Sequence, residues 1–202
     1  MSFWLIMMKN LALLKAPHIR PLDGLAALAL LTTTALRAFS QVEPGKSEEQ
    51  VIHYNSSDGL TDPVALLQKR VAAGQARLQF EPSHGYLVSL LKALRVPISS
   101  QGLVFSKTSS QADQTTPQTP RAIYFADEIY VGWVPGGRVI DLAAVDPNRG
   151  PIFYTLDQRA EGAPRFNRRA DCMQCHLGPK TLNVPGLLVR SVLTAPDGTA
   201  LS

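Results

Sequence analysis

The strongest constraint on the fold is a change of hydrophobic period after residue 121. Four short runs rich in β-branched and aromatic residues lie there, at residues 122–125, 129–134, 139–143 and 152–156. The residues between them favour turns: Ala126-Asp127, Pro135-Gly-Gly137 and Asp146-Pro-Asn-Arg-Gly150. Short strands joined by tight turns pair with their neighbours in sequence, so the pattern predicts an antiparallel meander of about four strands. We expect its Tyr and Trp side chains to pack within the sheet; lining a cofactor cleft is the alternative.

Two amphipathic helices are predicted before the meander. The first has Asp62 as its N-cap and Pro63 at the first helical position, and it ends at Gly74. Its apolar face consists of Val64, Leu67 and Val71. The second begins after Ser83 and ends at Pro97. Its apolar face consists of Leu87, Leu90, Leu91 and Leu94.

Two further segments complete the predicted domain. Residues 77–80 favour a short strand between the helices, and residues 107–120, rich in Ser, Thr, Gln and Pro, favour a surface loop. Helices followed by an antiparallel sheet place the chain in the α+β class. We expect one domain over residues 62–202.

The N-terminal 40 residues have the three parts of a secretory signal. Basic residues precede an uncharged apolar run at 24–35, and small residues occupy positions 38 and 40. This order predicts a signal peptide over residues 1–40, cleaved before Gln41 and followed by a linker over 41–61. The run is short for a membrane span. A buried amphipathic helix and an uncleaved membrane anchor are the alternatives.

The charge distribution argues against a nucleic-acid partner. The formal charge is +4 over 202 residues. Residues 1–40 contain four basic residues and one acidic residue, so the remainder holds 16 basic and 15 acidic residues. The basic character therefore belongs largely to the predicted signal peptide. We expect no nucleic-acid partner and no transmembrane domain apart from the signal segment.

The segment Cys172-Met-Gln-Cys175-His176 carries the clearest chemical signal. A c-type haem requires two thiols spaced to meet its two vinyl groups, and an imidazole that reaches the iron. These residues supply all three groups, with Cys172 and Cys175 as attachment sites and His176 as metal ligand. Because the chain has only two cysteines, a disulfide framework is excluded.

The segment resembles the haem-attachment site of c-type cytochromes. The runs 120–125, 130–133, 153–157 and 184–191 extend the likeness to an uncharacterised bacterial family described as cytochrome c domain-containing. The resemblance implies one covalent haem c and electron transfer between redox donor and acceptor proteins. The predicted signal peptide places the protein in the periplasm, and this agrees with the resemblance, because bacteria attach such haem outside the cytoplasm. Members of that family extend beyond residue 202, so we expect the haem-binding domain to be incomplete at its C-terminus.

Other functions for the two cysteines remain open. The pair could act as an exported thiol–disulfide oxidoreductase, or the haem could serve a redox enzyme, although an electron carrier is favoured over a catalyst. A zinc site would need Cys172 and Cys175 with two of His176, His84 and His53. A pair of free cysteines without function is the remaining alternative.

Three features around the motif suggest further roles. The sixth iron ligand could be His84, His53 or Lys180, a residue beyond residue 202, or absent, because neither Met nor His follows His176. Arginines just before the motif suit haem propionates or an acidic partner, or form a solvated turn: Arg165, Arg168 and Arg169. We also expect a carbonyl within residues 178–186 to accept the His176 ring N–H and fix its tautomer.

Overall fold

The computed structural model describes residues 53–189 and 191–201. The predicted signal peptide and residues 41–52 of the predicted linker lie outside these ranges. Residues 53–61 of that linker pack on the domain, because Tyr54 and Leu60 are buried in its hydrophobic core. Within the described ranges, no helix has the length and apolar character that crossing a membrane requires.

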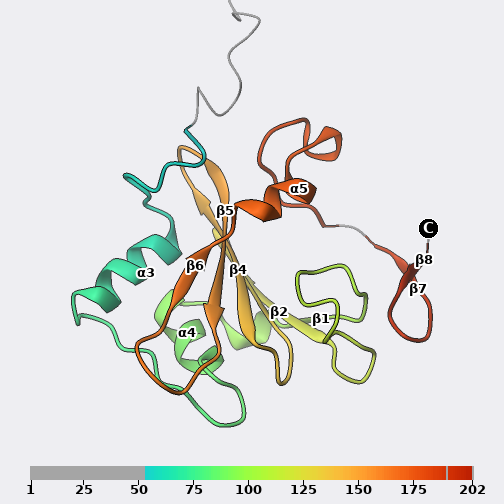
Figure 1. The fold of residues 1–202 in the computed structure, drawn as a ribbon, viewed down its shortest axis with the longest axis horizontal. Helices are drawn as coiled ribbons and strands as arrows, with labels where there is room; N and C mark the ends of the chain where they lie inside the picture. The colour runs from blue at the N-terminus through green and yellow to red at the C-terminus, as the bar shows by residue number, and fades with distance from the viewer. Residues whose placement is uncertain (1–52, 190, 202) are drawn as a thin grey trace, which may run out of the picture. The chain divides into compact units, whose positions relative to one another are not determined.

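A six-stranded antiparallel sheet forms the centre of the domain, with its strands side by side in sequence order (Figure 1). The strands are β1 (Gly102–Val104), β2 (Arg121–Ala126), β3 (Ile129–Trp133), β4 (Val139–Asp146), β5 (Gly150–Asp157) and β6 (Phe166–Arg168). The predicted meander corresponds to β2–β5 and is confirmed, as is the mixture of helices with an antiparallel sheet. The edge strands β1 and β6 were not predicted.

Helix α3 (Pro63–Ala72) begins as its sequence predicts. The Asp62 carboxylate accepts hydrogen bonds from the backbone N–H groups of Val64 at 2.9 Å and Ala65 at 3.0 Å. Its second oxygen accepts a bond from the Tyr154 hydroxyl of β5 at 2.7 Å. One fully buried carboxylate therefore caps the helix and joins it to the sheet.

Helix α4 (Leu87–Leu94) is shorter than predicted. The chain turns at Gly85, whose φ is +59°, so the helix begins at Leu87 and not directly after Ser83. It ends at Leu94, because the next residue, Arg95, adopts the left-handed conformation. Leu87, Leu90 and Leu91 are buried as predicted, and Leu94 is half-buried.

The strand predicted at residues 77–80 does not form. The hydroxyl of Ser89 in α4 accepts a bond from the Gln79 backbone N–H and donates one to its carbonyl. A side chain therefore satisfies the backbone groups that a neighbouring strand would otherwise pair.

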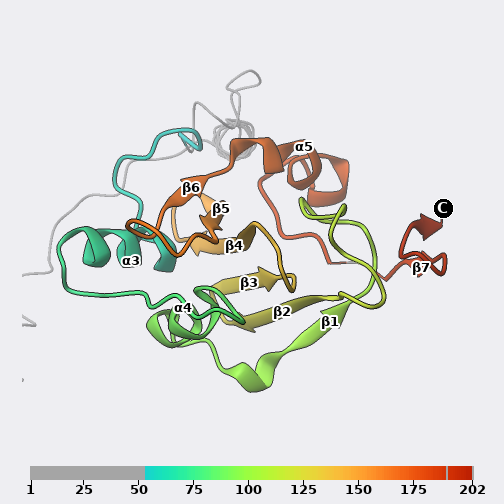
Figure 2. The ribbon, with the colours of Figure 1, turned by 60° about the horizontal axis from the view of Figure 1, so that its bottom comes forward.

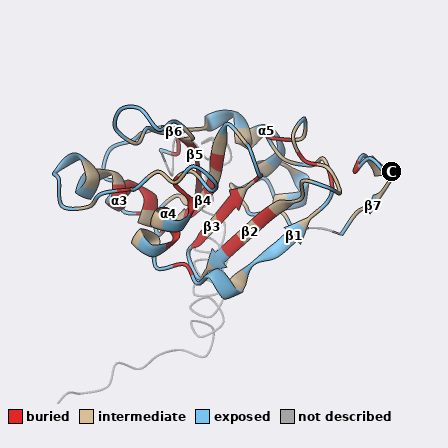
Figure 3. Cartoon of the chain, turned by 90° about the horizontal axis from the view of Figure 1, so that it is seen from below, coloured by how far each residue is buried: buried red, intermediate tan, exposed pale blue. Residues whose placement is uncertain are grey.

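The two faces of the sheet differ. The core face carries Val131, Leu142 and Tyr154, which pack with α3 and α4 in the hydrophobic core. Side chains alternate along a strand, so their neighbours point to the opposite side, which we call the open face. Figure 2 shows α3 and α4 grouped together and away from helix α5 (Met173–His176). Figure 3 shows the buried positions concentrated along the strands.

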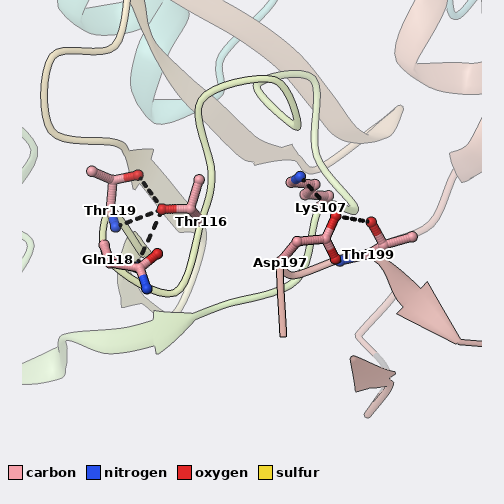
Figure 4. A network of polar contacts seen from close by, with 6 residues as sticks. All are labelled: Lys107, Thr116, Gln118, Thr119, Asp197 and Thr199. Carbon is pink, nitrogen blue, oxygen red and sulfur yellow. Dashed lines mark hydrogen bonds and ion pairs between the residues drawn. The ribbon is translucent and has the colours of Figure 1, made fainter. Parts of the chain in front are cut away.

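The polar loop predicted at residues 107–120 is confirmed, and part of it packs against the sheet. Ser110 and Gln111 donate hydrogen bonds to the Asp141 carboxylate of β4. The Lys107 ammonium lies 3.3 Å from the Asp197 carboxylate in the turn between β7 (Leu193–Thr194) and β8 (Ala200–Leu201) (Figure 4). The loop is therefore attached to both the sheet and this terminal hairpin.

Candidate functional site

The Cys-x-x-Cys-His segment forms a single helical turn directly after the last strand of the sheet. The 3₁₀ turn η2 (Ala170–Cys172) leads from β6 into α5, and the Arg169 backbone N–H bonds to the Phe153 carbonyl of β5 at 2.8 Å. Cys172 is half-buried and Cys175 is exposed, and both are free thiols. Residues three apart in a helical turn lie on one side, so the two thiols can meet one ligand.

The His176 ring is oriented by a backbone carbonyl. Its Nδ1 lies 2.9 Å from the Gly186 carbonyl oxygen, and the Gly186 N–H donates to the His176 carbonyl at 2.9 Å. A carbonyl can only accept, so Nδ1 carries the proton, and Nε2 of the neutral ring keeps its lone pair for a metal. The predicted bond from the ring N–H to a carbonyl within 178–186 is confirmed, at Gly186.

The loop that supplies this carbonyl is closed by Thr181. The Thr181 hydroxyl accepts a bond from the Gly178 N–H at 3.0 Å, within the 3₁₀ turn that includes η3 (Pro179–Thr181). Leu182 and Asn183 both have positive φ and reverse the chain. A Cβ on Gly186 would lie 2.9 Å from Cβ and Cγ2 of Thr181, so a side chain at this position would displace the loop.

Phe153 supports the histidine from the sheet. The ring centroids of Phe153 and His176 are 4.5 Å apart, with planes at 42°. Phe153 lies between Ile152 and Tyr154 of the core face, so it points to the open face. The imidazole is therefore fixed by a carbonyl at one edge and an aromatic ring beside it.

Burial and charge disfavour ionisation of Cys172. Burial raises the pKa of its thiol, and the nearby Asp171 carboxylate raises it further. Arg169 forms two hydrogen bonds with Asp171, from Nε at 2.9 Å and from Nη2 at 2.6 Å. These contacts lower the pKa of Asp171 and keep it charged. A thiol that resists ionisation is poorly suited to attack a disulfide.

The three arginines before the motif differ in their contacts. Arg168 donates to the backbone carbonyls of Tyr54, Asn55 and Ser56, and its guanidinium lies 5.3 Å from the Tyr54 ring centroid. It therefore holds the segment 53–57 on the domain. Arg169 is paired with Asp171, whereas Arg165 is exposed. Of the three, Arg165 is the one left available to a propionate or a partner.

His84 lies on the wrong side of the sheet to serve as sixth ligand. Its ring centroid is 5.6 Å from that of Trp133, which packs against the core. His176 lies against Phe153 on the open face, so the sheet separates the two histidines. His53 and Lys180 are exposed. Across residues 53–189 and 191–201, no three His, Cys, Asp or Glu side chains lie close enough together to hold a metal ion.

Apolar side chains are unusually exposed after the motif. At least 37% of each of these side chains is accessible to solvent: Leu177, Leu182, Val184, Leu187 and Val189. From the sequence, residues 178–186 were expected only to provide a carbonyl for His176, and residues 184–191 contributed only to the family likeness. The apolar residue types within this segment were the available signal. The contribution of Phe153 could not be found in the sequence, because it depends on how α5 crosses the sheet.

Comparison with known proteins returned no relative, since no family model, curated protein or solved structure matches the chain. The suitability of the site for haem therefore rests on its own geometry. The described residues fit this group: two free thiols one turn apart, an imidazole with its Nε2 lone pair available, and apolar side chains beside them.

Proposed function

We propose that the chain is an exported c-type cytochrome that carries electrons on one covalent haem. Cys172 and Cys175 would form the two thioether bonds, and His176 Nε2 would bind the iron. The haem would supply reversible one-electron chemistry between ferrous and ferric iron. The redox partners would be donor and acceptor proteins in the periplasm.

The hydrogen bond from His176 Nδ1 to the Gly186 carbonyl is the observation that carries this proposal. It fixes the tautomer in which Nε2 is the free ligand atom, and electron density from the carbonyl makes the imidazole a stronger donor to iron. A thiol–disulfide oxidoreductase does not require a histidine directly after its second cysteine. It does require a lowered cysteine pKa, whereas burial raises the pKa of Cys172.

The test is attachment of haem in a bacterial host that matures c-type cytochromes. We expect a denaturing gel of the exported protein to stain for haem, and Cys172→Ala/Cys175→Ala to abolish the stain. Gln174→Ala is the matched control, because Gln174 is exposed between the two cysteines and should leave the stain unchanged. A folded, exported protein without haem would overturn the proposal and favour thiol chemistry.

A further inference from the structure

A continuous row of apolar side chains crosses the open face and ends beneath His176. Cross-strand pairing joins Phe125 of β2 to Tyr130 of β3, Tyr130 to Ala143 of β4, and Ala143 to Phe153 of β5. Directly paired residues point to the same side, so these four form one row, which we call the aromatic row. It spans three strand spacings of about 4.8 Å, or roughly 14 Å, which is wide enough for a porphyrin.

The side chains of the aromatic row differ in how far they are exposed to solvent. Phe153 lies under His176 and is 8% exposed, whereas Phe125, at the far end, is 47% exposed. Tyr130 and Ala143 are half-buried, and the Phe125 and Tyr130 rings stack with centroids 6.2 Å apart. Aromatic surface that is covered beside the motif and open beyond it suits a flat apolar ligand held at the covered end.

The next row on the open face is closed by polar groups. Arg121 lies across Gly132, where a Cβ would be 2.3 Å from Arg121 Nη2, and pairs with Asp141 at 3.3 Å. Ser110 and Gln111 of the polar loop bond to the same carboxylate. Polar groups therefore border the aromatic row on this side.

We infer that the aromatic row forms one wall of the haem crevice, an inference that rests on the proposed function. Two thioether bonds restrict the haem to within a side chain's length of Cys172 and Cys175. His176, bound through Nε2, places it next to the Phe153 ring. From there the haem extends over Ala143 towards Tyr130 and Phe125, which exclude water from it.

Two measurements on the haem-loaded protein test this placement. The control for each is a substitution on the opposite side of the sheet. Leu66 on α3 is 46% exposed, almost the same as Phe125, but its helix packs on the core face. Phe125→Ser/Tyr130→Ser should lower the reduction potential, because water reaching the haem stabilises the more highly charged ferric state, and Leu66→Ser should leave it unchanged. Attached haem should quench the tryptophan fluorescence of Phe125→Trp more strongly than that of Leu66→Trp. For each variant, the unquenched reference is the same substitution in the haem-free Cys172→Ala/Cys175→Ala background.

The outcomes separate this inference from the proposed function. Covalent haem with equal quenching at both positions would overturn the placement and leave the cytochrome proposal standing. A second outcome would also overturn the placement: the haem-free protein self-associates, Phe125→Ser abolishes this association, and haem quenches both tryptophans equally. The aromatic row would then be a contact surface for a second copy of the chain. Absence of covalent haem would overturn both.

Discussion

Gly186 meets two requirements that no other residue type satisfies. Its carbonyl must reach His176 Nδ1, and its α-carbon must lie against Thr181 without a side chain between them. The imidazole orientation therefore depends on a close backbone contact ten residues further along the chain. The sequence predicted that a carbonyl in this loop would accept the His176 ring N–H, but it did not indicate that this carbonyl would belong to Gly186. That choice depends on the positive φ of both Leu182 and Asn183, and only asparagine is a residue type that favours this conformation.

Gly186→Ala should lower the yield of covalent haem and weaken the iron–histidine bond. The added Cβ would approach Thr181 to 2.9 Å, so the loop shifts and the carbonyl moves away from the ring. Haem per protein and the visible spectrum measure the effect. Gly178→Ala is the matched control, since a Cβ there meets nothing within 4 Å and its φ of 176° is open to any residue. Equal haem yields in the two variants would contradict this account of Gly186.

Cys172 in the haem-free protein should be slow to alkylate. Burial and Asp171 raise the pKa of its thiol, and iodoacetamide reacts with the thiolate. Between the ordinary cysteine pKa of about 8.5 and the raised value, Cys172 stays protonated while a free cysteine ionises. In Cys175→Ser, the midpoint of the rate against pH should therefore lie above that of a cysteine-containing peptide. A midpoint at or below the peptide value would show an activated thiol and favour disulfide chemistry.

Among the elements, α3 was predicted well because its signals are local. Asp62 and Pro63 define its start, and Gly74, with φ of +69°, follows its end. Helix α4 and residues 77–80 were predicted less well because distant groups decide them. Ser89 satisfies the backbone of Gln79, and the Gln158 side chain accepts the Tyr86 N–H at 3.0 Å just before α4. Neither contact is visible in a local pattern.

Asp62→Ala should destabilise the domain by about 2–4 kcal/mol. Loss of the helix cap costs about 1 kcal/mol, and the buried Tyr154 hydroxyl, left without an acceptor, costs about 1–3 kcal/mol. Urea unfolding measures the change. Asp62→Asn is the control, because its amide oxygen still caps α3 and the loss should be smaller. Equal losses in the two variants would show that the cap contributes little.

At the scale of the whole molecule, the sheet separates the hydrophobic core from the candidate site. Its core face packs with α3 and α4, and its open face carries His176, Phe153 and the aromatic row. The β-branched and aromatic runs of β2–β5 and the turn residues between them were readable in the sequence, which is why the meander was predicted. The edge strands β1 and β6 have three residues each, too few for a period to emerge. The route of the chain after β6 brings α5 to the open face. Because His84 lies on the core side of the sheet, it cannot be the sixth ligand of a haem bound at His176.

The most direct test of covalent haem is the mass of the tryptic peptide 170–180 from protein exported in a host that matures c-type cytochromes. Cleavage after Arg169 and Lys180 releases both cysteines and His176 in one fragment. The account predicts that this peptide carries the mass of one haem, survives denaturation with it, and shows the sharp α band of a c-type haem on reduction. The same peptide recovered without haem from folded, exported protein, with its thiols free or joined in a disulfide, would contradict it.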